Sequence, residues 1–331
     1  MNRTGLLLFG GLVVVLVAFP YLGVSSYVVS LASTILVAAI LAASVNFLAG
    51  NGALVSLGHG SIAAASAYGA AWASKNGHGM TTQVLVALAI TLAVSVAYGL
   101  VSMRTEGIYF IMVTLAVGQL IYGLAFRASP ITGGENGITN VTRPEVLGEY
   151  WMFYLFLVGA FVLATAVLWV ISNSPFGASL RGIRDSESRM RSLGYNVAAY
   201  KFSAILMSGT LAGFAGLLSV WHTHFVSPSS ANVHRSILLI VMVILGGLGT
   251  TTGPLIGAAI VVLVENVLSN SVERWPTVLG IIFILTILFA RAGIIGSLNK
   301  AITRVRRRRH DPTDGPPPEP QPEPLVSGTH P

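Results

Sequence analysis

Ten apolar stretches run along this chain, and they constrain its fold more than any other feature. A helix needs about 20 apolar residues to cross roughly 30 Å of hydrocarbon, whereas the strands of a membrane barrel are about ten residues long and alternate in polarity. The stretches therefore predict an all-α, polytopic membrane protein with about ten transmembrane helices. Their approximate bounds are 5–22, 28–48, 52–73, 82–101, 107–127, 151–172, 202–221, 236–247, 253–269 and 276–291.

The scarcity of charge agrees with this prediction. Only 9% of the residues are charged and 53% are hydrophobic, whereas a soluble domain carries roughly 25% charged residues. The chain has no cysteine, which excludes disulfides, thiol catalysis and Cys-ligated metal sites. The first apolar stretch has no clear small-residue cleavage site after it, so we interpret it as a retained helix and not as a signal peptide.

The apolar run 236–269 is too long for one crossing at about 1.5 Å per residue. Glycines and a proline in its middle predict a break into a short helix, a turn and a second helix; they are Gly246, Gly247, Gly249, Gly253 and Pro254. Such a break at membrane depth must be buried in protein or line a wet cavity.

Basic residues predict the orientation of the chain, because cytoplasmic loops carry an excess of Lys and Arg. With ten crossings and a cytoplasmic N-terminus, most basic residues fall on the cytoplasmic side, in the charged segment 174–201 and the tail. Those two regions share a side only if the run 236–269 crosses twice. We therefore expect both termini in the cytoplasm.

The segment 174–194, "SPFGASLRGIRDSESRMRSLG", gathers charge that the rest of the chain avoids. Its length and polarity rule out a membrane span. We predict an exposed pair of short helices, the first beginning at Pro175, the second capped by Asp185 and closed by Gly194. Glu187 in the first turn, and Arg189 and Arg191 in the last, would complement the second helix dipole. Ile183, Glu187, Met190 and Leu193 are expected on one face, which either docks on a partner or is a solvated loop.

Other polar groups have two readings each. His59, in "SLGHGS" near the start of the third apolar stretch, either lines a pore or has a structural role. The outer loop "ITGGENGI" either faces a ligand or partner with free backbone N–H groups or is a plain turn. Its candidate residues are Thr132, Gly133, Gly134, Glu135 and Gly137. His222 and His224 are read as outer-loop histidines, since no acidic residue supports a metal site.

Enzymatic motifs do not occur in the chain. "GGLGTTTG" (246–253) resembles a phosphate loop, but it lacks the lysine that reaches the phosphates and follows an apolar run, not a strand. The tail divides into a basic cluster, "RVRRRRH" (304–310), and a Pro-rich segment that has too few apolar groups to fold. The basic cluster either contacts anionic lipid headgroups or serves only as an orientation signal.

Several stretches together resemble the LivM-type membrane subunit of branched-chain amino acid ABC importers. They are "NFLAGNGALVSLGHGSIAAASAYGAA" (46–71), "RTEGIYFIMVTLAVGQLIYG" (104–123), "TGGENGI" (132–138), "LGYNVAAYKFSAILMSGTLAGFAGLL" (193–218) and "VMVILGGLGTTTGPLIGA" (241–258). The closing "ERWPTVLGIIFILTILFARAGIIG" (273–296) fits too, although the family more often has Pro-Arg-Gly-Leu where this chain has Arg-Ala-Gly-Ile at 291–294.

The resemblance implies a division of labour in an ATP-driven importer. A soluble or lipid-anchored binding protein delivers substrate, this chain and a homologous second permease form the path, and two ATPase subunits bind ATP and magnesium. This chain would then be no enzyme, bind no cofactor, metal or nucleic acid, and lie in a bacterial inner membrane. Residues 1–300 would form the permease domain, with the coupling loop 174–201, and 301–331 the basic and disordered tail.

The resemblance also assigns candidate residues. Those expected to couple to the ATPases are Gly182, Ile183, Arg184, Asp185, Glu187, Arg189, Met190, Gly194 and Lys201. Those expected near the translocation path are Ser56, Leu57, Gly58, His59 and Gly60. Two alternatives stay open: the same machine importing urea, amides or other amino acids, and a stand-alone secondary transporter.

Overall fold

The structure is a computed structural model that describes residues 3–268, 275–289 and 293–296. Apart from one bridge between Ile138 and Val226, its regular structure is helical throughout this described part. The main helices are α1 (Arg3–Ala18), α2 (Ser26–Gly52), α3 (His59–Lys75), α4 (Met80–Ser102), α5 (Gly107–Arg127), α6 (Ser129–Thr132), α7 (Tyr150–Asn173), α8 (Pro175–Asp185), α9 (Glu187–Ser192), α10 (Val197–Thr223), α11 (Val233–Gly246), α12 (Gly253–Leu263) and α13 (Trp275–Phe289). Short 3₁₀ turns cover Phe19–Leu22, Gly134–Asn136, Glu145–Leu147 and Pro228–Ala231, and a π-helical turn, η5 (Val264–Leu268), extends α12.

Each of the ten predicted apolar stretches overlaps one of these helices, so the all-α prediction is confirmed. Five of the helices are long and apolar enough to cross a membrane by themselves, namely α2, α4, α5, α7 and α10. The chain is therefore a multi-pass membrane protein, while the count of ten crossings stays a prediction. The predicted tail, 301–331, lies outside the described residues.

Helix α4 shows how the chain suits a lipid solvent. Its buried face carries polar and small side chains at helical spacing, including Gln83, Thr91 and Ser95. Its outer face carries Leu85 and Leu88, which are 61% and 45% exposed. Polar groups turned inward and leucines turned outward are the reverse of a soluble helix, as expected where hydrocarbon is the solvent.

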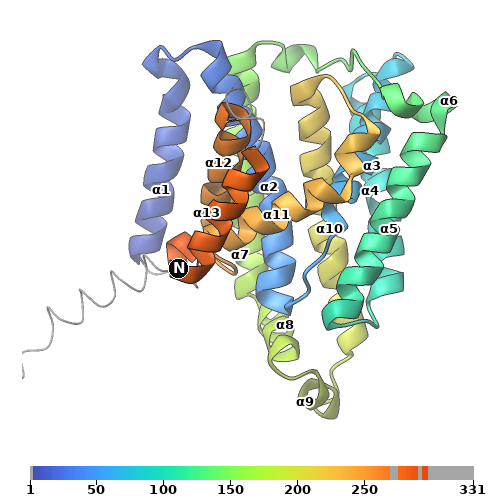
Figure 1. Cartoon of the computed structure of the whole chain (residues 1–331), viewed down its shortest axis with the longest axis vertical. Helices are drawn as coiled ribbons and strands as arrows, with labels where there is room; N and C mark the ends of the chain where they lie inside the picture. Colours follow the sequence, from blue (N-terminus) through green and yellow to red (C-terminus); the bar gives the residue numbers. More distant parts are fainter. Residues whose placement is uncertain (1–2, 269–274, 290–292, 297–331) are drawn as a thin grey trace, which may run out of the picture.

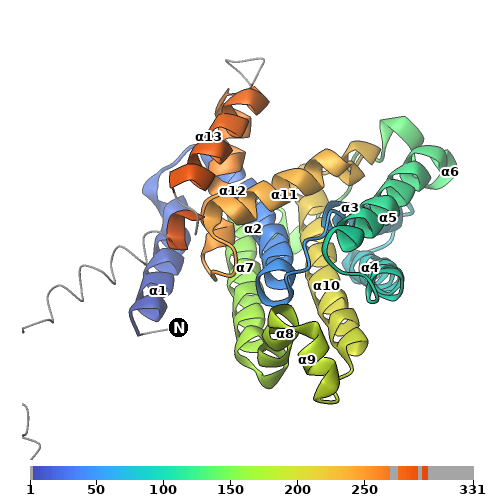
Figure 2. The ribbon, with the colours of Figure 1, turned by 60° about the horizontal axis from the view of Figure 1, so that its bottom comes forward.

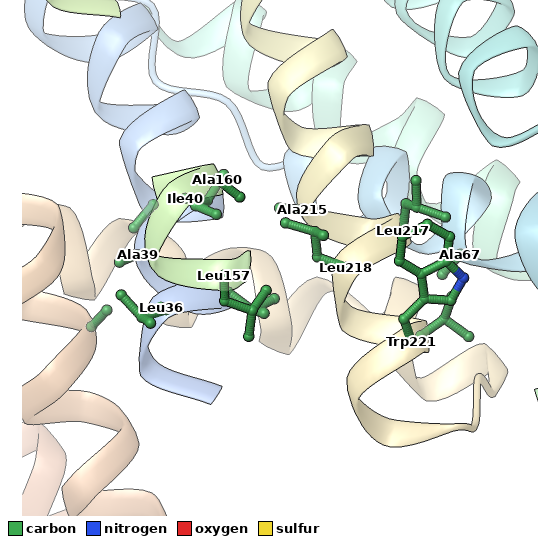
Figure 3. Close-up of a cluster of buried hydrophobic side chains, with 14 of the residues drawn as sticks. Leu36, Ala39, Ile40, Ala67, Leu157, Ala160, Ala215, Leu217, Leu218 and Trp221 are labelled. Atoms are coloured by element: carbon green, nitrogen blue, oxygen red, sulfur yellow. The ribbon is translucent and has the colours of Figure 1, made fainter. Parts of the chain in front are cut away.

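The core lies around α2 and α10, which pack against each other and against most of the other long helices (Figure 1). Figure 3 shows Leu36 and Ile40 of α2 next to Leu157 of α7, and Trp221 of α10 beside Ala67 of α3. Small residues let these helices approach closely. A Cβ atom at Gly216 of α10, for example, would lie 2.0 Å from the carbonyl oxygen of Ala63 in α3.

The predicted break in the run 236–269 is confirmed. Helix α11 ends at Gly246 and α12 begins at Gly253, and Gly247 and Gly249 between them have φ angles of +116° and +76°. A Cβ atom at Gly257 of α12 would lie 1.7 Å from the carbonyl oxygen of Met242. The two helices therefore form a tight hairpin that only glycine allows at this contact.

The two ends of the bundle differ. Helices α8 and α9 protrude at one end, whereas α6 and the segment that follows it lie at the opposite end (Figures 1 and 2). The two polar regions singled out in the sequence are thus separated by the length of the apolar helices.

Candidate functional site

The protruding segment begins as two capped helices. Pro175 occupies the first turn of α8, as predicted, and the Ser174 hydroxyl accepts a hydrogen bond from the Gly177 N–H. The predicted cap of α9 was wrong by one residue. Ser186, not Asp185, accepts from the Arg189 N–H at 3.4 Å, because Asp185 is still helical and ends α8 beside Arg184.

The predicted charges and C-terminus of α9 are confirmed: Glu187 lies in its first turn, Arg189 and Arg191 in its last, and Gly194 has a left-handed φ of +85°. The predicted shared apolar face is wrong. Ile183 is 4% exposed in α8, whereas Leu193 is 67% exposed beyond α9. The extended backbone at Ser186 ends the first helix, so residues before and after it no longer share a helical face.

Two arginines attach α8 to the membrane helices. The Nη1 of Arg184 donates to the carbonyl oxygen of Gly50 in α2 at 2.8 Å. The Nη1 of Arg181 donates to the carbonyl oxygen of Ser172 in α7 at 2.6 Å and to the Asn51 Oδ1 at 3.2 Å. Hydrogen bonds from a charged group are stronger than neutral ones, so α8 is fixed to the ends of two helices. The sequence places Arg181 among the basic residues of this segment but predicts no role for it.

An ion pair attaches α9 to α10. The Nζ of Lys201, whose side chain is 5% exposed, lies 2.6 Å from the Oε2 of Glu187, and Arg191 bonds the other carboxylate oxygen. Burial alone would raise the pKa of Glu187. The hydrogen bond from Lys201 and the charges of Lys201 and Arg191 outweigh it and hold this pKa below its ordinary value.

The predicted coupling residues therefore fall into two groups. Those that hold the helix pair in place are Gly182, Ile183, Arg184, Glu187, Met190 and Lys201, with the Met190 side chain packed on Gly182. Those at the surface are Asp185, Arg189 and Gly194. Beside the latter lie the exposed side chains of Arg191, Leu193 and Tyr195, and we call residues 189–195 the tip. The tip combines apolar and basic groups, which suits contact with another protein.

The turn between α11 and α12 binds a side chain of α2, not a phosphate. The amide of Asn46 accepts from the Gly249 N–H at 2.7 Å and donates to the Thr250 carbonyl oxygen at 2.8 Å. This turn, α2, α7 and α8 enclose a cavity of about 490 Å³ that Arg181 and Arg184 border. The glycine-rich motif thus positions the broken helix pair beside the protruding helices.

Of the predicted path residues, Ser56, Leu57 and Gly58 lie in a non-helical segment among the helices, whereas His59 and Gly60 begin α3. Helix α2 continues to Gly52 and α3 begins only at His59, so the predicted third stretch, 52–73, started too early. Neighbouring hydroxyls satisfy the backbone between them. Leu57 N–H donates to Thr114 Oγ1 at 3.2 Å, and the Gly58 carbonyl oxygen accepts from Ser61 Oγ at 2.7 Å. This is how an irregular backbone survives at membrane depth.

His59 links three helices. Its Nε2 lies 2.7 Å from the Ser208 Oγ of α10, and that hydroxyl donates to the Ser44 carbonyl oxygen of α2 at 2.6 Å. Because the hydroxyl proton is used, the Nε2 carries a hydrogen and donates it to Ser208. The ring is 2% exposed, which favours the structural reading of His59 over the pore-lining one. Of the five predicted path residues, Gly60 borders a described cavity.

The outer-loop residues form a compact turn at the opposite end from the tip. Gly133, Gly134 and Gly137 all have positive φ angles, and Thr132 Oγ1 donates to the Ala125 carbonyl oxygen at 2.7 Å. The turn leads into two hydrogen bonds between Ile138 and Val226, of 2.9 and 3.0 Å. Glu135 is exposed at the surface of this turn.

His222 in the last turn of α10 and His224 just after the helix have structural partners. His222 Nε2 lies 3.0 Å from Thr34 Oγ1, and His224 bonds the Val141 carbonyl oxygen at 2.7 Å and Arg143 at 2.8 Å. Within the residues that the structure describes, no group of three His, Asp or Glu side chains is placed to hold a metal ion.

Comparisons with known proteins extend these observations. The LivM permease protein of the high-affinity branched-chain amino acid transport system of Salmonella typhimurium is 28% identical over 313 residues, which cover 86% of this chain and 73% of that protein. The Escherichia coli LivM protein matches with the same identity and coverage. The autoinducer 2 import system permease protein LsrC of Yersinia pseudotuberculosis is 24% identical over 216 residues, 63% of this chain and 60% of LsrC.

Among solved structures, an inward-facing ABC transporter of metal-chelate type aligns with 90% of this chain and 98% of that chain, at 20% identity and a TM-score of 0.47, which is too low to support a comparison of folds. A family model, described as branched-chain amino acid transport system / permease component, matches residues 27–290, which hold every long helix of the described fold. The chain therefore belongs to the family of permease components of branched-chain amino acid transport systems.

Proposed function

We propose that this chain forms half of the translocation path of an ATP-driven importer for branched-chain amino acids. Its partners would be a homologous second permease, two ATPase subunits that bind ATP and magnesium, and a binding protein that delivers substrate at the end where Thr132–Gly137 lie. Family membership supports the importer role. The polar helix pair at the other end supports a contact with separate ATPases.

One observation carries the mechanism. The tip is exposed, yet the helices α8 and α9 that carry it are bonded to α2 through Arg184 and to α10 through Glu187 and Lys201. Helices α2 and α10 are the centre of the bundle. A force applied to the tip by ATPases that close on ATP would therefore tilt the core helices and change which end of the path is open.

The test is co-purification of the ATPases with the permease from cells that express the whole complex. Arg189→Glu and Leu193→Glu reverse a charge and remove an apolar contact at the tip, so we expect the ATPases to be lost while the permease still inserts. Glu149→Lys, at an exposed residue before α7, is the control and should retain them. Retention of the ATPases by both tip variants would contradict the proposal.

A second test concerns the substrate. The wild-type complex in proteoliposomes, supplied with its binding protein and ATP, should accumulate labelled leucine, isoleucine or valine. The similarity to LsrC makes other cargo a real alternative, so urea, short amides and other amino acids belong in the same assay. Uptake of one of these without uptake of leucine would reject the assigned substrate but keep the importer. Uptake by the isolated chain, without ATPases or binding protein, would reject the ATP-driven importer.

A further inference from the structure

A second cavity, of about 290 Å³, lies between α2, α3, α10, α11, α12 and the loop 225–230. Its volume is at the lower end of the range for small-molecule sites, roughly 300–1,000 Å³. Small residues on α3 and α10 make the space; they are Gly60, Ala63, Ala64, Ala67, Ala215 and Gly216. The cavity is thus large enough for a small metabolite and lies in the centre of the bundle.

Two pairs of polar side chains border this cavity. Thr34 Oγ1 of α2 lies 3.0 Å from His222 Nε2 of α10, and Arg235 of α11 faces Glu265 after α12. Much of the remaining lining is apolar; it includes Val37, Leu41, Val220, Leu238, Leu239, Met242 and Val262. The cavity therefore combines polar and charged groups with apolar surface.

The cavity lining carries one charge of each sign. Arg235 Nη1 and Glu265 Oε1 are 3.9 Å apart, and their side chains are 58% and 28% exposed. Charge-assisted hydrogen bonds are about 2.7–2.9 Å long, so these two groups are near each other but form no direct hydrogen bond. Both groups therefore retain the capacity to bond a ligand, the guanidinium to a carboxylate and the carboxylate to an ammonium group.

We propose that this cavity holds an α-amino acid with a branched aliphatic side chain during transport. Arg235 binds its carboxylate, Glu265 binds its ammonium group, and its side chain packs on the apolar lining residues Leu238 and Met242. The substrate class rests on the proposed function, but the site is assigned from the cavity and its charged pair. A zwitterion is the ligand that satisfies both charges of the pair at once.

The absence of cysteine from the chain allows a direct test of occupancy. Ala64→Cys adds a small thiol to the cavity lining, and Thr251→Cys adds one to the 490 Å³ cavity at the other end. In the assembled complex without ATP, leucine should slow the reaction of a small thiol reagent with the first thiol and leave the second unchanged. Equal rates at Ala64→Cys with and without leucine would overturn the proposal.

Charge variants separate binding from a structural ion pair. Arg235→Gln and Glu265→Gln should each lower leucine uptake by about tenfold or more. Binding-protein-stimulated ATP hydrolysis should persist. The double variant removes both charges. If the pair were only structural, the double variant would recover leucine uptake because no unpaired charge remains. If the pair binds the substrate, uptake by the double variant will be no higher than uptake by either single variant.

The control for these variants is a pair of exposed charges outside the cavity lining, Arg127→Gln and Glu149→Gln, for which wild-type uptake is expected. Normal uptake by Arg235→Gln and Glu265→Gln, in a wild-type background that imports leucine, would overturn this site and leave the proposed function intact. A wild-type complex that imports no branched-chain amino acid would reject the proposed function itself, and the occupant assigned here with it.

Discussion

The Nζ of Lys201 lies 2.6 Å from the Oε2 of Glu187, and this pair joins the first turns of α10 to the protruding helix α9. The Lys201 side chain is 5% exposed, so a lysine without its partner would be a buried and unpaired charge. Removing one member of a buried pair is costly because the remaining charge keeps its desolvation penalty. The pair is therefore a structural element that a single substitution can test.

Glu187→Gln is expected to lower the free energy of unfolding by about 1–3 kcal/mol, because it removes the carboxylate that Lys201 requires. The measurement is the thermal unfolding midpoint of the purified chain in detergent. Glu149→Gln, at an exposed carboxylate, is the matched control and should be neutral. A midpoint for Glu187→Gln that equals the control would show that the pair adds no stability.

The same pair predicts a dependence on pH. The folded pKa of Glu187 lies below its ordinary value of 4.5, so the stabilisation is complete above that value and is lost as pH falls through the folded pKa. The difference in stability between wild type and Glu187→Gln should be constant near neutral pH and shrink below about pH 4. A difference that instead grew with acidity would contradict this assignment.

Much of the fold could be predicted because the solvent imposes the pattern. Apolar stretches of membrane length predicted the helices. The glycines and Pro254 between two of these stretches predicted the hairpin at Gly246–Gly253. The start of α3 was missed because residues 53–58 are as apolar as a helix. Their non-helical backbone depends on hydroxyls from elsewhere in the chain, such as Thr114, which no local pattern indicates.

The candidate site was predicted less completely. Charge and capping residues were enough to locate α8 and α9. Asp and Ser both cap helices well, so the sequence could not decide between Asp185 and Ser186 as the cap of α9. That choice depends on where the first helix ends. The partners of Arg184 and Lys201 lie far away in sequence. The anchoring contacts of these residues and the charged pair of Arg235 and Glu265 depend on how the helices pack, so they could not be predicted from the sequence.

Gly216→Ala tests the close approach of α10 and α3. The new Cβ atom would lie 2.0 Å from the Ala63 carbonyl oxygen, so the helices must separate. We expect a loss of about 1–3 kcal/mol in stability, as for overpacked cores. Gly159→Ala in α7 is the matched control, since nothing lies within 4 Å of its added Cβ atom. It should be neutral or stabilise by up to about 1 kcal/mol. Equal midpoints for the two variants would refute the contact.

Single cysteines test the sidedness of the chain. Ser188 in α9 and Asn136 in the outer loop are both exposed and lie at opposite ends of the bundle, and the chain offers no competing thiol. Because basic residues concentrate around Ser188, we expect a membrane-impermeant reagent on intact cells to label Asn136→Cys but to label Ser188→Cys only after permeabilisation.

The sequence places Ala301 on the same side as Ser188, provided that an even number of crossings separates them. Labelling of Ala301→Cys from the outside would contradict the double crossing by 236–269, and labelling of Ser188→Cys from the outside would place the tip where no ATPase could reach it.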